Sequence, residues 1–518
     1  MLLLFRGYGS INYMKSLIET SIKAYFKLRQ YRVQSWKRNQ VTTQEIIFTE
    51  LLRSAENTEY GRKYGFDRIV DYAGFQRDVP IVSYDDLQPY ISRMLNGERD
   101  VLWPGFVPYF SKSSGTTSDV SKYIPVSKPA LQRNNYKAGK DLYSIFFANY
   151  PESDLFRNSG SVFGLGGSFE YNPSGIKVGD VSAIIMSEVP RWAERHREPS
   201  LDVALMPHWK DKIPAMIKDT QSKNITHLSG VPTWFISLFD EMKKNHDYST
   251  LRDIWPNLEL FIHGAVAFAP YRPLFEKLLP FSDMKYMEVY NASEGFFAIQ
   301  DMPDKIGEML LLTDHGVFYE FIPMSVYGTS DQYTIPLSGV EVDVDYAMVI
   351  TTNAGLWRYD IGDTVSFTSI DPYRIRISGR TKHFINVFGE ELMVGNTEEA
   401  LTHVCAKTGA TIENYTAGPI FMDETGSGGH EWVVEFKQLP ADIDTFIDLL
   451  DLELCSVNSD YAAKRQDDIA LQKLKLHVAP PGTFMDWMGQ RGRLGGQNKV
   501  PRLSNSRKYI DQIIDMIN

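Results

Sequence analysis

Residues 258–290 read LELFIHGAVAFAPYRPLFEKLLPFSDMKYMEVY, and their pattern predicts the architecture of the chain. Its two ends, Leu258–Ile262 and Lys285–Tyr290, are short apolar runs of the kind found in buried strands. Between them, Tyr271–Leu279 has the apolar spacing of a helix. A strand, a helix and a second strand in succession predict an α/β sheet that is layered by helices.

The same alternation continues upstream of this stretch. Further strands are expected at Val162–Leu165 and Ala183–Met186, and further helices at Ile213–Thr220 and Thr233–Asn245. The chain before them is helical in pattern from residue 14 to about residue 57. Ser83 and Asp85 are both suitable N-caps for a helix that runs through Met94.

Downstream, the pattern changes twice. From Gly307 to Ile377 strands follow one another with few helices, which predicts an antiparallel sheet or a β-barrel-like part. Beyond it we expect a hairpin, a helix, a strand and a final helix, at 419–422 with 431–436, 441–456, 474–478 and 504–518. A domain boundary near Ser378–His383 therefore divides the chain into a large N-terminal α/β domain, residues 1–380, and a small C-terminal α+β domain, residues 381–518.

Composition narrows the class of protein. The chain has 518 residues and a formal charge of −11, without a long Lys/Arg run, which argues against nucleic acid and for a small-molecule substrate. Cys405 and Cys455 have no zinc-ligand spacing, so a reducing cytoplasm is expected. The apolar run Leu2–Phe5 is too short for a signal peptide or a membrane span, and Met14 is an alternative start.

The first motif with chemistry is Ser111–Lys122, which reads SKSSGTTSDVSK. A flexible turn rich in hydroxyls can aim side-chain and backbone donors at ATP phosphates. It is not a Walker A loop, because the G-x-x-x-x-G-K-[ST] spacing is absent. The alternative is an ordinary surface loop, since the same residues dominate turns.

Two further motifs follow predicted strands. Tyr290–Glu294 ends a buried strand, where ligands gather in open α/β sheets, and Glu294 can hold Mg²⁺ on the phosphates. Leu356–Asp363 places an aspartate after a glycine turn, where a carboxylate can bind ribose hydroxyls. A solvated strand end and a simple β-turn remain the alternatives.

The last two motifs concern the C-terminal domain. Ile377–Lys382 joins the two predicted domains and suits a hinge, although an ordinary turn is equally consistent. Gly496–Arg502 reads GQNKVPR and places Lys499 in a glycine-rich loop. A cationic loop tip can neutralise a developing negative charge, while the alternative is an exposed lysine.

Taken in this order, the motifs resemble the Gretchen Hagen family of acyl-acid amido synthetases, within the acyl-adenylate-forming superfamily. The resemblance implies ATP and Mg²⁺ as cofactors and, as substrates, a carboxylic acid and an amine such as an amino acid. It also implies that the small domain rotates about Arg380–Lys382 between two half-reactions. The site residues that it implies are catalytic Lys499 and Glu294, with Glu294 also the metal ligand, and nucleotide-binding Ser113, Ser114, Gly115, Thr116, Thr117, Lys122, Tyr290, Ser293, Asp363 and Arg380.

Ser229–Phe235 and His263–Phe268 resemble the segments from which the superfamily builds its acid and adenine pockets. The resemblance implies Val231, Trp234 and Phe268 as apolar walls, and a place in the core is an equal alternative for them. His208, His227 and His263 are expected to be structural.

Two departures from plant members stand out: Asn291-Ala292-Ser293 in the second motif, and Asp360 where plant members have arginine. The alternatives to an amido synthetase are an acyl-CoA ligase and a catalytically silent binding relative.

Overall fold

The structure is a computed structural model that describes residues 21–113, 122–206, 209–245, 250–265, 268, 272–381, 384–385, 392–420, 429–458, 461–462, 465, 471–491, 500–504 and 506–517. Its N-terminal part is helical, as expected. Residues 21–38 form one helix, followed by α2 (Gln40–Ala55), α3 (Glu59–Tyr64), α4 (Tyr72–Asp78) and α5 (Tyr84–Leu95). Ser83 and Asp86 form a capping box that starts α5, so the expected N-cap at Ser83 is confirmed.

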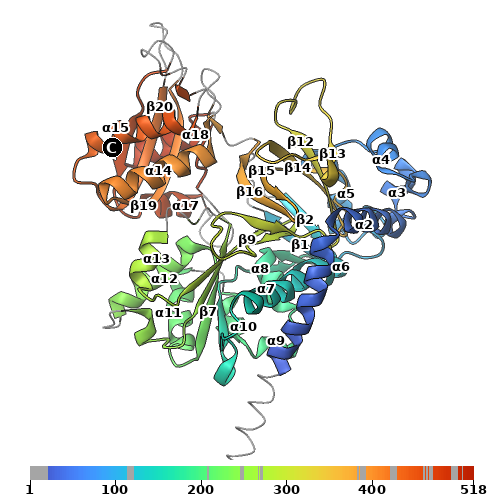
Figure 1. Ribbon diagram of the computed structural model, residues 1–518, viewed down its shortest axis with the longest axis horizontal. Helices are drawn as coiled ribbons and strands as arrows, with labels where there is room; N and C mark the ends of the chain where they lie inside the picture. Colours follow the sequence, from blue (N-terminus) through green and yellow to red (C-terminus); the bar gives the residue numbers. More distant parts are fainter. Residues whose placement is uncertain are drawn as a thin grey trace, which may run out of the picture.

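A sheet of twelve strands organises the large part of the molecule (Figure 1). Its order is β13-β12-β14-β15-β16-β11-β10-β9-β8-β7-β3-β6. The strands are β3 (Ser161–Gly164), β6 (Arg197–Glu198), β7 (Ile225–Gly230), β8 (Leu260–Gly264), β9 (Lys285–Ala292), β10 (Gly295–Ile299), β11 (Met309–Leu311), β12 (Val317–Pro323), β13 (Ile335–Pro336), β14 (Asp345–Thr352), β15 (Tyr359–Ile370) and β16 (Tyr373–Arg380).

The half from β9 to β6 is parallel and is layered by helices on both faces. Successive residues of a strand point to opposite faces, and β8 shows the result. Phe261 packs with α11 (Trp209–Thr220), α12 (Pro232–Asn245) and α13 (Arg272–Leu278), whereas Ile262 packs with α7 (Tyr136–Asn149). The expected layered α/β architecture is therefore confirmed.

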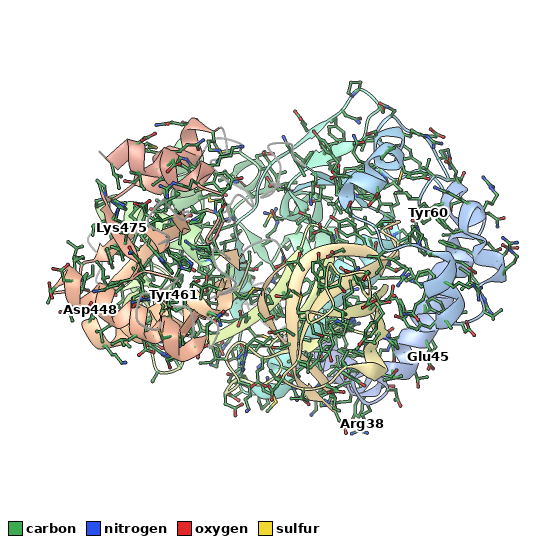
Figure 2. The ribbon with its side chains drawn as sticks, turned by 90° about the horizontal axis from the view of Figure 1, so that it is seen from above. Arg38, Glu45, Tyr60, Asp448, Tyr461 and Lys475 are labelled. Atoms are coloured by element: carbon green, nitrogen blue, oxygen red, sulfur yellow. The ribbon has the colours of Figure 1, made fainter. Side chains whose placement is uncertain are left out.

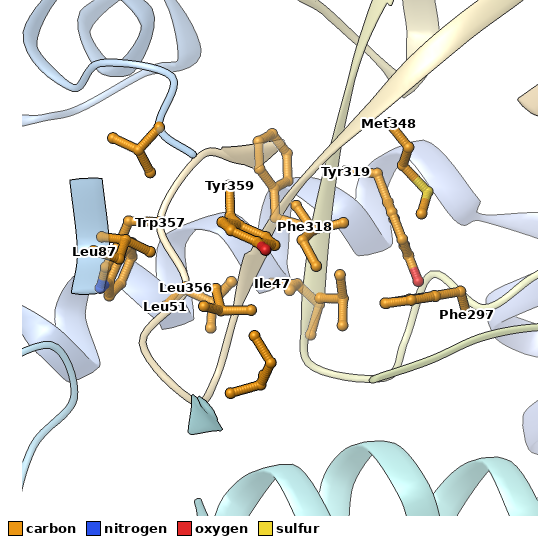
Figure 3. Close-up of a cluster of buried hydrophobic side chains, with 14 of the residues drawn as sticks. Ile47, Leu51, Leu87, Phe297, Phe318, Tyr319, Met348, Leu356, Trp357 and Tyr359 are labelled. Atoms are coloured by element: carbon orange, nitrogen blue, oxygen red, sulfur yellow. The ribbon is translucent and has the colours of Figure 1, made fainter. Parts of the chain in front are cut away.

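The half from β10 to β13 is antiparallel, and its core is continuous with the N-terminal helices. Figure 3 shows this cluster, in which Ile47 and Leu51 of α2 lie beside Phe318 and Tyr359. Trp357, two residues before β15, is fully buried and donates its Nε1 hydrogen to the carbonyl of Leu102 at 2.9 Å. The start of β15 is thus fixed by the core.

A smaller sheet of order β2-β1-β5-β4 accompanies the large one. It consists of β1 (Tyr109–Ser113), β2 (Lys122–Val126), β4 (Phe169–Tyr171) and β5 (Lys177–Gly179). The expected strand Ala183–Met186 is wrong, because this segment belongs to helix α8 (Val181–Ser187). A short apolar run does not distinguish a buried strand from a helix segment, and the backbone bond from Ile184 N to Asp180 O makes it helical.

Strands after Thr381 belong to other sheets. Short strands β17 (Phe384–Ile385) and β18 (Leu392–Met393) pair together, and β19 (Thr411–Ile420), β20 (Gly429–Gln438) and β21 (Lys475–Ala479) form a second sheet. Helices α14 (Val394–Thr408), α15 (Ile443–Val457), α17 (Thr483–Gln490) and α18 (Lys508–Ile517) accompany them. The expected α+β character is confirmed, whereas a domain division at residue 380 stays a prediction.

The C-terminal elements lie at one end of the molecule and the N-terminal helices at the other. Figure 2 shows Asp448 and Tyr461 on the side opposite Glu45 and Tyr60. None of the helices in the described ranges is long and apolar enough to cross a membrane.

Candidate active site

The second motif forms the end of β9 and the tight turn into β10. Ala292 pairs with Gly295, so Ser293 and Glu294 are the two residues of the turn. Gly295 follows at a crowded position, where an added Cβ would lie 3.0 Å from the Phe297 ring and 3.4 Å from Asn134 Oδ1. The expected position of Glu294 at a strand end is therefore what the backbone shows.

A buried hydrogen bond joins the second motif to the third. The hydroxyl of Tyr290 donates to Asp363 Oδ2 at 2.5 Å, and both residues are buried, 5% and 4% exposed. Three strands separate β9 from β15 in the sheet order. At a strand spacing of about 4.8 Å, a flat sheet would hold them roughly 19 Å apart, farther than these two side chains reach together. The antiparallel half must therefore curl, as the expected barrel-like part requires.

The turn before Asp363 is also closely defined. Gly362 has φ +80°, which favours glycine, and its N–H donates to Asp360 Oδ1 at 2.9 Å. Asp363 stands opposite Arg380 across β15 and β16. The structure thus brings Tyr290, Asp363 and the backbone of Arg380 together.

Carboxylates gather around one buried tyrosine at this place. Burial raises the pKa of Tyr359 well above its usual value, and the negative charges of Glu294, Asp360 and Asp363 add to this effect. Glu294 and Ser293 also border a small hollow, which is lined by Pro125, Val126, Ala130, Asn134, Asn135, Ser293, Glu294, Gly295, Val317, Thr352, Asn353 and Ala354. The second and third motifs therefore share one region of concentrated negative charge.

The hydroxyl-rich motif lies at the end of the β1–β2 hairpin. Ser113 and Lys122 stand opposite each other in this antiparallel pair, and Ser114, Gly115, Thr116 and Thr117 lie outside the described residues. The Lys122 ammonium is 5.5 Å from the centre of the Tyr84 ring. The two ends of the predicted phosphate loop are thus adjacent, as a loop between paired strands requires.

Of the expected acid-pocket residues, Phe268 is buried against core rings. Its ring stacks on His263 with centroids 3.9 Å apart and packs against Phe275. Val231 follows β7 and is half-buried, while the side chain of Trp234 lies outside the description. Their role as pocket walls stays a prediction.

Two of the three histidines have structural surroundings. His227 contacts the Tyr143 hydroxyl at 2.8 Å and the Thr226 hydroxyl at 3.0 Å. Burial lowers the pKa of both His227 and His263 to about 3, so each imidazole is neutral near pH 7. His208 lies outside the described residues.

Lys499 also lies outside the described residues, but the segment that follows it is anchored. Residues 500–504 run beside β19, where Ala417 N donates to Arg502 O at 2.8 Å and Thr416 Oγ1 donates to Pro501 O at 2.6 Å. The Arg502 guanidinium lies 4.6 Å from the centre of the Tyr415 ring. This pairing was not expected from the sequence.

One contact of the β9–β10 hairpin was not predicted from the sequence, namely a pair of hydrogen bonds from a buried asparagine to its backbone. Asn134 lies in a π-helical turn, Leu131–Asn135, and is 2% exposed. Its Oδ1 accepts from Phe296 N at 2.7 Å and its Nδ2 donates to Phe296 O at 2.9 Å. Asparagine in a helical pattern carries no periodic signal of such a contact.

Comparison with known proteins now gives the family. Three family models match consecutive parts of the chain: the GH3 family N-terminal domain at residues 29–284, the GH3 family central domain at 310–380 and the GH3 family C-terminal domain at 395–508. The chain belongs to the GH3 family. This is the family that the motifs resemble, so the expected membership is confirmed.

Among GH3 relatives, an indole-3-acetic acid-amido synthetase of Arabidopsis thaliana, GH3.4, is 25% identical, with 93% of this chain and 92% of the relative aligned. The GH3.8 indole-3-acetic acid-amido synthetase of Oryza sativa subsp. indica is 26% identical, over 89% of this chain and 87% of that protein. These relatives are named amido synthetases, and they align with nearly the whole of this chain. The GH3 chain is therefore a ligase.

Solved structures give the same fold. The GH3.15 acyl acid amido synthetase matches with a TM-score of 0.79 at 17% identity, over 95% of this chain and 96% of that one. A 2-hydroxyisobutyryl-CoA ligase in the postadenylation state matches with a TM-score of 0.57 at 12% identity, over 91% of both chains. The GH3 chain therefore has the fold of adenylate-forming enzymes.

Proposed function

We propose that this chain is an ATP-dependent acyl-acid amido synthetase, which forms an acyl-adenylate from a carboxylic acid and transfers the acyl group to an amine such as an amino acid. The observation that carries the proposal is the buried bond between Tyr290 and Asp363, which unites two motifs at nucleotide-binding positions of the family. The named activities of the GH3 relatives support it.

In the first half-reaction, a carboxylate oxygen of the acid bonds to the α-phosphorus of ATP, and the bond from that phosphorus to pyrophosphate breaks. Positioning and charge stabilisation are the protein's main contributions. We assign ribose binding to Asp363. Tyr290, Ser293 and Arg380 help to hold the nucleotide, and Lys499 neutralises the negative charge that develops during the reaction. Phosphate binding is assigned to Ser113, Ser114, Gly115, Thr116, Thr117 and Lys122.

Glu294 fits a Mg²⁺ ligand that acts together with the phosphates. Mg²⁺ usually binds through one or two carboxylates plus substrate oxygens. The described ranges contain no group of three or more His, Cys, Asp or Glu side chains that could hold a metal ion. When bound, the ion supplies charge neutralisation on the phosphates, and Glu294 would hold it.

In the second half-reaction, the amine nitrogen attacks the acyl carbon. The carbon–oxygen bond to AMP breaks, AMP leaves with the electron pair, and the nitrogen loses a proton. We propose that Val231, Trp234 and Phe268 border the acid, that the C-terminal domain from residue 381 rotates between the halves, and that the enzyme works in the cytoplasm.

The test is hydroxylamine trapping of acyl-adenylates across aromatic, indolic and fatty acids, followed by product analysis with an amino-acid panel and with CoA. We expect ATP-dependent hydroxamate from at least one acid and an amide from at least one amino acid. A thioester without an amide would make the chain an acyl-CoA ligase. No pyrophosphate exchange with any acid would make it a silent binding relative.

A further inference from the structure

Asp360 stands where plant members have an arginine, and both of its carboxylate oxygens accept hydrogen bonds. Oδ1 accepts from Gly362 N at 2.9 Å, and Oδ2 accepts from the Tyr327 hydroxyl at 2.7 Å. Within the third motif, Asp360 therefore makes structural contacts. Tyr327 comes from the connection between β12 and β13, so this contact ties that connection to the start of β15.

Thr381, the first residue after β16, belongs to the same network. Its N–H donates to Gly362 O at 2.9 Å, its hydroxyl lies 3.4 Å from that oxygen, and it is 6% exposed. Burial and the Asp360 carboxylate raise the pKa of Tyr327 to about 12, and a hydrogen bond from the Thr381 hydroxyl opposes this rise. Tyr327, Asp360, Gly362 and Thr381 thus form one connected group, which we call the junction network.

The C-terminal body, by which we mean the elements from β17 to α18, packs against the end of β16, the strand end beside the junction network. An added Cβ on Gly395, at the start of α14, would lie 2.7 Å from Ser378 O. An added Cβ on Gly379 would lie 3.3 Å from Met393 Cε. Any displacement of the end of β16 therefore changes how α14 sits on the large sheet.

We infer that Asp360 and Tyr327 are positioning residues that hold Thr381 and so fix the orientation of the C-terminal body. The inference rests on the proposed function in one respect, namely that two half-reactions need two orientations. Tyr327 and Asp360 both lie in the large domain and support the Gly362 turn, whose carbonyl accepts from Thr381 N. Because Thr381 is the first residue of the part that rotates, its contact with Gly362 can favour one orientation over the other. A weaker Gly362 turn therefore shifts the population, and the two half-reactions then change by different factors.

The experiment compares Tyr327→Phe and Asp360→Ala with the wild type. Pyrophosphate exchange measures adenylation, and amide formation from a chemically supplied acyl-adenylate measures transfer. A hydrogen bond to a charged group accounts for about tenfold or more in an equilibrium. We expect the ratio of the two rates to shift about tenfold in Tyr327→Phe, and to shift with the same sign and at least as far in Asp360→Ala, which also removes the acceptor of Gly362 N.

Tyr333→Phe is the matched control. Tyr333 lies in the same connection, is 50% exposed, and its hydroxyl has no hydrogen-bond partner among the residues that the structure describes. This variant should retain the wild-type ratio. An equal loss in both half-reactions, or an unchanged ratio, in Tyr327→Phe would overturn the inference.

A second measurement is independent of catalysis. Spin labels at Glu45 and Asp448, in a background without Cys405 and Cys455, report the distance between the two ends of the molecule shown in Figure 2. We expect the distance distribution to change in Tyr327→Phe and to stay unchanged in Tyr333→Phe. If the wild type forms no adenylate, the proposed function fails while this comparison still decides the inference, and an unchanged distribution overturns it.

Discussion

At the scale of single residues, Asp363 and Tyr290 meet in the interior and not at the surface. The sequence predicts where each one lies along the chain, because a strand end and a glycine turn are local features. It does not predict that they touch, since that contact depends on the curl of a sheet across three intervening strands. Likewise, nothing local connects Asp360 with Tyr327, thirty-three positions earlier.

We predict that Asp363→Ala weakens ATP binding more than acid binding. Loss of a charged hydrogen-bond partner of the ribose should cost about 1.5–3 kcal/mol, which is about ten- to a hundredfold in affinity. Calorimetric titration with ATP measures the change. Asp345→Ala, an exposed position on the neighbouring strand β14, should leave the affinity unaltered. If Asp363→Ala binds ATP as tightly as the wild type, Asp363 has only a structural role in the turn.

We predict that Lys499→Ala slows adenylate formation by about 10²–10³, the usual effect of losing one preorganised donor at a developing charge. Amide formation from a supplied acyl-adenylate should change much less, because the phosphate displacement is then complete. Both rates are measured on one preparation. Equal losses would assign Lys499 to binding or to domain structure, and no loss would move the role to Lys382 or Lys122.

At the scale of elements, long periodic segments were predicted well, and short ones with a mixed outcome: β3, β8 and β9 lie where they were expected, whereas Ala183–Met186 is helical. Helices α11, α12 and α15 follow the apolar spacing of their sequences. Strand β7 was not predicted, because it contains the polar residues Thr226, His227 and Ser229. Their burial depends on hydrogen-bond partners that the local sequence pattern does not show. The hairpin strands β19 and β20 are also longer than their apolar runs, since the pairing extends through Thr411–Gln438.

The β9–β10 hairpin allows a prediction at this scale. Asn134→Ala should loosen the hairpin, because the Phe296 amide loses its acceptor in a buried setting, at a cost of about 1–3 kcal/mol. Hydrogen exchange of the Phe296 amide should accelerate accordingly. Asn135→Ala, one position later, is the control, since the side-chain amide of Asn135 forms no hydrogen bond within the described part of the chain. If the exchange rate of the Phe296 amide is unchanged in Asn134→Ala, the hairpin is stable without the contact to Asn134.

At the scale of the whole molecule, Asp301 ties three distant segments together. It accepts from Lys37 at 2.5 Å and from Arg374 at 2.8 and 2.9 Å, and its backbone carbonyl accepts from Asn149 at 3.0 Å. Burial acts to raise the pKa of Asp301, but the hydrogen bonds from Arg374 and Lys37 hold it below its usual value. The ionised carboxylate is therefore favoured by folding.

We predict that Asp301→Asn lowers stability by about 3 kcal/mol near pH 7, because two cations lose their partner. A lowered folded-state pKa gives stability that is present above the unfolded value of about 3.9 and is lost as pH falls through the folded value. The difference in Tm from the wild type should thus shrink below about pH 4. Exposed Asp304→Asn is the control, and a pH-independent difference would contradict the assignment.

The curl of the large sheet has a consequence for synthesis on the ribosome. Tyr290 is made 73 residues before Asp363, and β11 is made before its neighbour β16. A nascent chain that stops short of residue 373 therefore presents β11 as an open edge, the kind of surface that recruits other strands or chaperones. While residues 312–373 are being synthesised, this open edge exposes the polypeptide to misassembly.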